Sequence, residues 1–116
     1  MRLLAMTLFA GIAAAPAMAE YKTIGDVNTF RSVVEGRTLT RPLIKLQVLP
    51  GGKITGTGGG AEVSGSWDWK GQYFCRDLNW RGRDLGYNCQ TVSINGGKIR
   101  FTADQGQGES ADFRLR

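Results

Sequence analysis

The sequence predicts a mainly β domain, an antiparallel up-and-down meander of about seven or eight short strands forming a small barrel or curled sheet, with one N-terminal helix. After residue 36, apolar and polar residues alternate with a period of two, and glycine-containing turns divide the alternating segments. The hairpins that these turns define agree on a single apolar face. A continuous sheet of this kind must close or fold over to cover that face.

Residues 26–35 carry the pattern of the helix. Asp26 suits the N-cap position and Gly36 suits the residue after the C-terminal end. The apolar side of the helix consists of Val27, Phe30, Val33 and Val34. Because an apolar helix face needs cover, we expect the helix to pack against the sheet and close one end of the barrel.

Two connections set the register of the C-terminal strands. Asn95-Gly96 is typical of a two-residue type I′ turn, which places Val92 opposite Ile99. The return through the 104–110 loop then places Ile99 opposite Leu115. Both pairings put apolar side chains on the same side of the sheet.

The central strands give the same result. Lys70-Gly71 is a second two-residue turn signal and places Trp67 opposite Phe74, while Pro50-Gly51-Gly52 joins two earlier strands. The shared apolar face comprises Ile44, Leu46, Val48, Ile54, Val63, Trp67, Trp69, Phe74, Leu78, Trp80, Val92, Ile94, Ile99, Phe101, Phe113 and Leu115.

The first nineteen residues have the pattern of a secretory signal peptide. Arg2 precedes an apolar run over residues 3–15, and Ala17-Met18-Ala19 forms an A-x-A cleavage site before Glu20. The run is shorter than the roughly 20 residues that a membrane-spanning helix needs. We therefore expect a periplasmic or secreted protein whose mature part, residues 20–116, is a single β-domain with no transmembrane segment.

Export also decides how the two cysteines are interpreted. An exported chain with two cysteines most simply contains one disulfide, here between Cys75 and Cys89. If the two residues are directly opposed across a hairpin, Arg76 faces Asn88 and the disulfide lies on the outside of the wall, beside Asp77. The chain-entropy model gives such a loop about 3 kcal/mol of stabilisation.

A few polar residues interrupt the apolar face and are the candidates for interior binding. They are Arg76, Asn88 and Gln90, with Trp67 and Trp80 nearby. Arg76 is expected to face inward beside Gly65, which leaves room for it. A buried guanidinium must be paired or hydrogen-bonded. Two interpretations follow: either Arg76 bonds to carbonyl or carboxylate groups and locks the barrel, or it lines a pocket for a small anionic or sugar-like ligand.

Catalytic and cofactor sites are poorly supported. The chain contains no histidine, which removes Ser-His-Asp and Cys-His systems and histidine metal sites. The segment 56–61 matches a dinucleotide fingerprint formally, but an alternating strand pattern follows it where the fingerprint needs a helix. Of the available carboxylates, Glu62 and Asp68 fall on the outward face and Asp77 lies beside the predicted disulfide, so solvated surface charge is the favoured interpretation. We therefore expect no enzyme activity, no cofactor and no metal.

Two segments carry a resemblance to known proteins: Tyr73-Phe74-Cys75-Arg76-Asp77-Leu78 and Leu85-Gly86-Tyr87-Asn88-Cys89-Gln90. With these, the chain resembles a group of small exported bacterial proteins of no established activity, some of which carry the label dihydrodipicolinate reductase. Reductases of that family are far longer two-domain proteins with a nucleotide-binding fold, and none of their catalytic motif can be placed here. A looser likeness, in architecture only, is to periplasmic C-type lysozyme inhibitors, which implies a disulfide-bonded antiparallel domain and no particular residues.

These observations predict a non-catalytic exported binding or inhibitor-like module. It would use the open barrel mouth or the hairpin tip, where Arg81 and Arg83 lie beside Trp80 and Tyr87 and suit an acidic protein partner. One alternative is a carrier of a small anionic ligand held at Arg76. Another is an envelope protein that binds anionic surfaces weakly through distributed charge. No block of lysine and arginine of the nucleic-acid-binding type is present, so we expect no nucleic acid partner.

Overall fold

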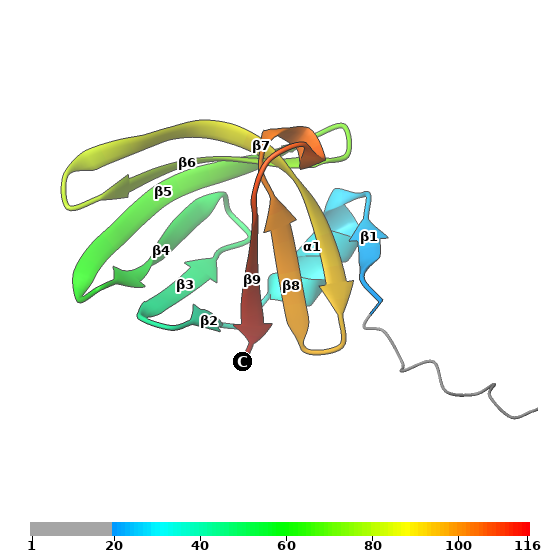
Figure 1. The fold of residues 1–116 in the computed structure, drawn as a ribbon, viewed down its shortest axis with the longest axis horizontal. Coiled ribbons are helices and arrows are strands. Elements are labelled where there is room, and N and C mark those ends of the chain that lie inside the picture. The colour runs from blue at the N-terminus through cyan, green and yellow to red at the C-terminus, as the bar shows by residue number, and fades with distance from the viewer. Residues whose placement is uncertain (1–19) are drawn as a thin grey trace, which may run out of the picture.

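A computed structural model describes residues 20–116 and shows a closed antiparallel barrel of eight strands, with one extra strand and a single α-helix (Figure 1). The predicted fold class is confirmed. The predicted signal peptide, residues 1–19, lies outside the described residues and stays a prediction.

The elements follow in chain order as β1 (Lys22–Ile24), α1 (Val27–Val34), β2 (Leu39–Arg41), β3 (Ile44–Val48), β4 (Lys53–Gly58), β5 (Ala61–Lys70), β6 (Tyr73–Trp80), β7 (Arg83–Asn95), β8 (Lys98–Thr102) and β9 (Ser110–Leu115). Around the barrel the order is β7-β6-β5-β4-β3-β2-β9-β8, and β8 pairs with β7 to close the ring. The extra strand β1 pairs with the second half of β7. Its three residues are too few to show a period, which is why the sequence pattern did not reveal it.

The helix forms where the sequence predicts it. Asp26 is the N-cap, and its carboxylate accepts a hydrogen bond from the Thr29 backbone N–H at 2.8 Å. Phe30 is fully buried, and its ring lies 5.1 to 6.4 Å from four aromatic rings of the barrel interior. These rings belong to Trp67, Trp69, Phe74 and Phe101. The helix therefore covers one end of the barrel, as expected.

Two predicted hairpin registers are wrong by two residues. Lys98 pairs with Asn95, so the loop is Gly96-Gly97, and Val92 faces Phe101 in place of Ile99. In the same way Lys70 pairs with Tyr73. In both loops the positive-φ glycine, at +58° for Gly96, takes the first loop position, whereas the prediction put it second. A shift of two residues keeps every side chain on its predicted face because the side-chain period of a strand is two.

The last hairpin also departs from its predicted register. Thr102 pairs with Ser110 and the Ala103 N–H donates to the Glu109 carbonyl at 2.9 Å, so the connection spans 103–109 in place of 104–110. Ile99 therefore faces Phe113 in place of Leu115. The predicted apolar face is retained, and Ile99, Phe113 and Leu115 are all buried.

The disulfide register is confirmed. Cys75 and Cys89 are bonded and directly opposed, and Arg76 faces Asn88 as expected. Both cysteines follow the outward-pointing series, and neither belongs to the hydrophobic core cluster of the described residues. Cys75 is nevertheless only 1% exposed. The disulfide is therefore a covalent link on the outer side of the wall that is itself largely shielded from water.

Candidate functional site

A cavity of about 190 Å³ lies inside the barrel beside Arg76. Its lining comes mostly from apolar side chains, and three polar ones join them: Arg76, Gln90 and Glu109. Of these, Gln90 is buried, Arg76 is half-buried and Glu109 is exposed. The interior is thus not completely filled by the tryptophans and the helix.

The cavity continues toward the barrel end that the helix leaves open. A second hollow of about 700 Å³ lies there, among the β2–β3, β4–β5 and β6–β7 turns. The two hollows share Leu46, Leu78, Ala111 and Phe113 in their linings. In Figure 1 these turns lie on the left and α1 on the right, so we call this open end the mouth.

Arg76 lies on β6 between Trp67 of β5 and Asn88 of β7. Its Nη1 donates a hydrogen bond of 2.8 Å to the backbone carbonyl of Gly86. Burial lowers the pKa of this guanidinium, and the charge of Asp77 opposes part of that shift. A guanidinium has five N–H donors, so the single bond to Gly86 leaves capacity for a ligand.

The prediction that Arg76 lies beside Gly65 is wrong, because Gly65 pairs with Leu78. A Cβ atom on Gly65 would lie 2.0 Å from the Asp77 carbonyl oxygen, so this glycine serves close backbone approach. The Arg76 side chain instead reaches Gly86, which lies in a bulge of the facing strand β7. One residue of β6 there opposes two residues of β7, Leu85 and Gly86.

Asn88 and Gln90 form a chain of hydrogen bonds on β7. Gln90 Nε2 donates to Asn88 Oδ1 at 3.1 Å, and Asn88 Nδ2 donates to Asp104 Oδ1 at 2.8 Å. The Asp104 backbone N–H returns a bond of 3.0 Å to Asn88 Oδ1. This exchange holds the connection before β9, where Asp104 and Gln105 both have positive φ. Gln90 lines the cavity, whereas the amide of Asn88 is engaged by the loop.

The structure separates the two predicted interior tryptophans. Trp67 is 6% exposed, packs on Phe30, and donates from Nε1 to the Leu49 carbonyl at 2.8 Å. Trp80 lines the mouth and donates from Nε1 to the Gly58 carbonyl at 2.8 Å. Trp67 therefore belongs to the core under the helix, and Trp80 belongs to the opening.

The three residues predicted to form a binding surface at the hairpin tip, Arg81, Arg83 and Tyr87, do not all lie together. Arg81 lies at the mouth with its Cζ 4.9 Å from the Trp80 ring centroid, and Arg83 is exposed at the start of β7. Tyr87 is 51% exposed, but it lies on the outer wall, where its hydroxyl is 3.8 Å from Cys89 Sγ. Arg81 and Trp80 thus form one unit at the hairpin tip, and Tyr87 covers the disulfide.

Two exposed leucines at the mouth were missed by the sequence analysis. Leu43 is 83% exposed with φ of +69°, and Leu85 is 49% exposed at the bulge. Both line the mouth together with Arg41 and Arg81. Pro42 before Leu43 and Gly86 after Leu85 were the available signals, since both residue types mark irregular backbone.

Within residues 20–116, no group of three or more histidine, cysteine or acidic side chains is placed to hold a metal ion. No helix in this part of the chain has the length and apolar character needed to cross a membrane. The resemblance described above stays a prediction. Comparisons of the chain with family models, with curated proteins and with solved structures found no match.

Proposed function

We propose that this domain is a non-catalytic binding module whose barrel takes up a small amphipathic anion. The ligand's charged head would lie at Arg76, and its apolar body would extend toward the mouth. The observation that carries this proposal is the largely apolar cavity with one half-buried guanidinium in its wall. Of the functions predicted from the sequence, this corresponds to the carrier of a small anionic ligand.

The preference for an anion follows from the cost of burying charge. A guanidinium removed from water is stabilised best by an anionic partner, and among the described residues the one side-chain hydrogen bond of Arg76 goes to a neutral carbonyl. Glu109 lines the same cavity but is exposed, and the one ion pair among residues 20–116 joins Arg100 to Asp112. A carboxylate or phosphate on a ligand would supply the missing countercharge in a bidentate arrangement.

The preference for an apolar body follows from the rest of the lining. Leu39, Val48 and Ile54 contribute aliphatic surface to the cavity, and Leu43 and Leu85 extend this surface to the rim. Burying a hydrocarbon chain there stabilises a complex by about 25 cal/mol per Å² of apolar area removed from water. The inner cavity is small, so it suits the head and the first carbons, and the mouth suits the remainder.

The test uses three ligands with straight hydrocarbon chains of nearly equal length and different head groups: decanoate, decanol and decyltrimethylammonium. Binding is followed by tryptophan fluorescence of the full domain and by isothermal titration calorimetry. We expect decanoate to bind best, and Arg76→Met to weaken its binding by about ten- to a hundredfold, because a charged hydrogen-bond pair is lost. Decanol should bind Arg76→Met and the unchanged protein equally.

The matched control is Arg37→Met, which removes an exposed arginine outside the barrel interior. It should leave decanoate affinity unchanged. Equal loss in both variants, or tighter binding of decyltrimethylammonium than of decanoate, would contradict an anion site at Arg76. Circular dichroism and heat denaturation show whether each variant remains folded.

The hairpin tip favours a second candidate, an inhibitor-like contact with an acidic protein surface. Arg81 and Gly82 both have positive φ, as in a type I′ turn, and Arg81 stacks on Trp80. This holds a cation and an aromatic ring together at an exposed position. The variant Arg81→Glu with Arg83→Glu should abolish such docking, whereas Arg76→Met should leave it intact.

A further inference from the structure

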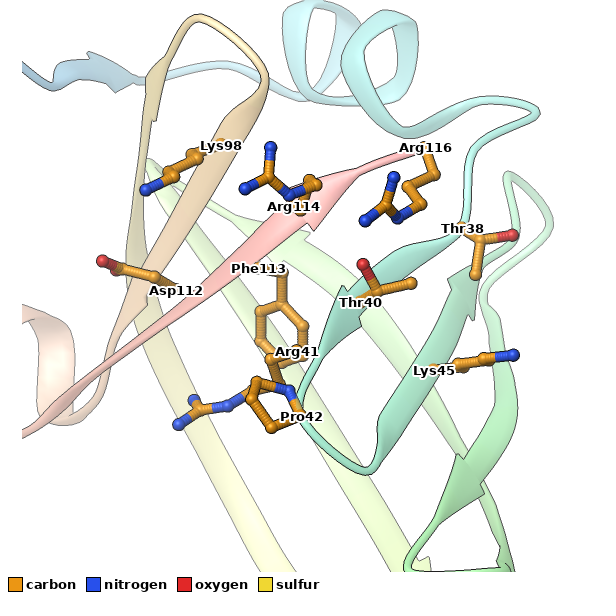
Figure 2. Close-up of a pocket in the computed structure, with 10 residues that line it drawn as sticks. All are labelled: Thr38, Thr40, Arg41, Pro42, Lys45, Lys98, Asp112, Phe113, Arg114 and Arg116. Atoms are coloured by element: carbon orange, nitrogen blue, oxygen red, sulfur yellow. The ribbon is translucent and has the colours of Figure 1, made fainter.

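A different hollow, of about 760 Å³, lies on the outside of the barrel over β3, β2, β9 and β8 (Figure 2). Five basic side chains line it: Arg41, Lys45, Lys98, Arg114 and Arg116. All five are exposed. We call this surface the basic wall. It opens on the outer side of the barrel, because Lys45, Lys98 and Arg114 point away from the core. It adjoins the mouth, with which it shares Arg41, Pro42 and Phe113.

Strand pairing explains why these residues meet. Lys45 of β3 pairs with Thr40 of β2, Thr40 pairs with Arg114 of β9, and Arg114 pairs with Lys98 of β8. Paired residues point to the same side of a sheet, so the four side chains form one row across four strands. With strands about 4.8 Å apart, the row is roughly 14 Å long. Arg116 directly follows β9, and its backbone N–H donates to the Thr38 carbonyl at 2.9 Å, so its side chain lies near Thr38 in Figure 2.

The basic wall lacks a countercharge from the protein. Asp112 is the one acidic residue in its lining. That carboxylate is already engaged by Arg100, with Nε at 2.7 Å from Oδ1 and Nη2 at 3.0 Å from Oδ2. Arg100–Asp112 is also the one ion pair within residues 20–116. None of the five basic groups forms an ion pair within residues 20–116, although, after the hydrogen bonds from Arg100, the charge of Lys98 also contributes to the lowered pKa of Asp112.

The surplus charge of the domain is concentrated here. Residues 20–116 contain fourteen basic and ten acidic side chains, and the basic wall holds five of the former and one of the latter. Nine basic and nine acidic side chains remain in the rest of the domain, so the net side-chain charge there is zero. Along the chain these five residues form no block of basic residues, and only the closed barrel brings them together.

We propose that the basic wall binds a linear acidic polysaccharide lying across the strands. Repeating carboxylate or sulfate groups match a row of cations, and the hydroxyls of Thr38 and Thr40 can bond to sugar hydroxyls between them. Phe113, the aromatic residue of the lining, is 9% exposed and offers no face on which bases of single-stranded nucleic acid could stack. A recessed surface also suits a single chain better than a flat membrane.

The test compares two double variants with the same net charge. Lys45→Glu with Lys98→Glu changes the basic wall, and Lys22→Glu with Lys53→Glu changes two exposed strand lysines outside it. The probes are heparin fragments, which carry sulfate and carboxylate, polygalacturonate fragments, which carry carboxylate only, and neutral dextran. Binding is measured by calorimetry between low and physiological salt.

We expect both acidic probes to bind and dextran not to bind. The basic-wall variant should bind about tenfold to a hundredfold more weakly, because two attractions become repulsions. The control variant should stay within about twofold, because neither of its lysines lines the basic wall and exposed charges outside the contact are partly screened at about 0.1 M salt. Binding of the unchanged protein should weaken as salt rises.

Equal weakening in the two double variants would show that total charge matters and would overturn the proposal. So would binding that neither variant changes. Tighter binding to phosphatidylglycerol vesicles or to single-stranded DNA than to both acidic polysaccharides would overturn the choice of occupant. Circular dichroism of each variant confirms that losses do not come from unfolding.

Discussion

The guanidinium of Arg76 donates to the backbone carbonyl of Gly86 across the pair of strands β6 and β7, at 2.8 Å. Gly86 lies in the bulge where two residues of β7 oppose one of β6. The bulge thus presents a carbonyl to the cation and also moves Leu85 to the mouth. Bulges commonly redirect side chains beside binding sites, and this one connects both parts of the proposed ligand path.

Gly86→Ala should therefore weaken both the fold and the site. Gly86 has φ of +89°, and no heavy atom lies within 4 Å of a Cβ built on it. The cost is then backbone strain alone, about 1–2 kcal/mol in urea unfolding. Decanoate affinity should fall as the bulge relaxes away from Arg76.

Gly25→Ala is the matched control, because a Cβ there also has open space but the residue has no positive φ. Its stability should change by less than about 0.5 kcal/mol. If both variants unfold at the same urea concentration, the bulge conformation is not strained for alanine, and the link between Gly86 and Arg76 is wrong.

Removing the disulfide should lower stability without dismantling the barrel. Cys75→Ala with Cys89→Ala is expected to cost about 3 kcal/mol, mainly because the unfolded chain regains freedom in the closed loop. The core cluster of the described residues excludes both cysteines, so its packing should persist. The measurement is urea unfolding with near-ultraviolet circular dichroism. An unchanged midpoint, or loss of the tryptophan signals before unfolding, would contradict this account.

The alternation of the strands was enough to predict which side of the wall each residue faces. It could not fix the partners, because Val92 opposite Ile99 and Val92 opposite Phe101 satisfy the same face. The choice between them depends on which loop position the glycine takes, and Gly96 is compatible with either. The disulfide register was predictable because a covalent bond between Cys75 and Cys89 leaves no such freedom.

The candidate site was predictable only in part. Arg76 stands out as a cation on an apolar face, so its inward position follows from alternation. The bulge at Leu85-Gly86 changes that alternation locally, and no period reveals it. The basic wall was not predictable at all from neighbours in the chain, because Lys45 and Arg114 meet only when β2 pairs with both β3 and β9.

Lowering the pH should remove the contribution that the ionised Asp112 carboxylate makes to the stability of the folded state. Hydrogen bonds from Arg100, together with its charge, lower the pKa of this carboxyl below its ordinary value of 3.8. A group whose pKa is lower in the folded state stabilises the fold above its unfolded pKa, and this contribution is lost as pH falls through the folded pKa. Asp112→Asn should therefore be less stable than the unchanged protein near neutral pH.

The difference between the two proteins should shrink as the pH falls from neutral to below the ordinary carboxyl pKa of 3.8. Thermal unfolding across this range measures it. Glu62→Gln is the control, since Glu62 is an exposed strand residue outside the Arg100–Asp112 pair, and its effect should not vary in the same way. A stability difference for Asp112→Asn that stays constant with pH would rule out this ion pair as the source.

Phe30→Ala tests whether the helix closes the barrel. The side chain is fully buried, with its ring centroid 5.3 Å from that of Trp67 and 5.1 Å from that of Phe74. Truncation leaves a cavity under the helix, for which we expect a loss of about 3–5 kcal/mol. Val27→Ala, half-buried on the same helix, should cost less than about 1.5 kcal/mol and controls for changes in helix propensity.

Phe30→Ala also tests whether the stability of the barrel and the binding of the ligand depend on the same residues. Phe30 is not among the residues lining the cavity beside Arg76, although Phe74 contacts both Phe30 and the cavity. Where Phe30→Ala remains folded, decanoate should still bind preferentially over decanol. Loss of that preference in the folded variant would mean that the helix shapes the ligand site directly. Unchanged stability would mean that the barrel does not depend on its helix for closure.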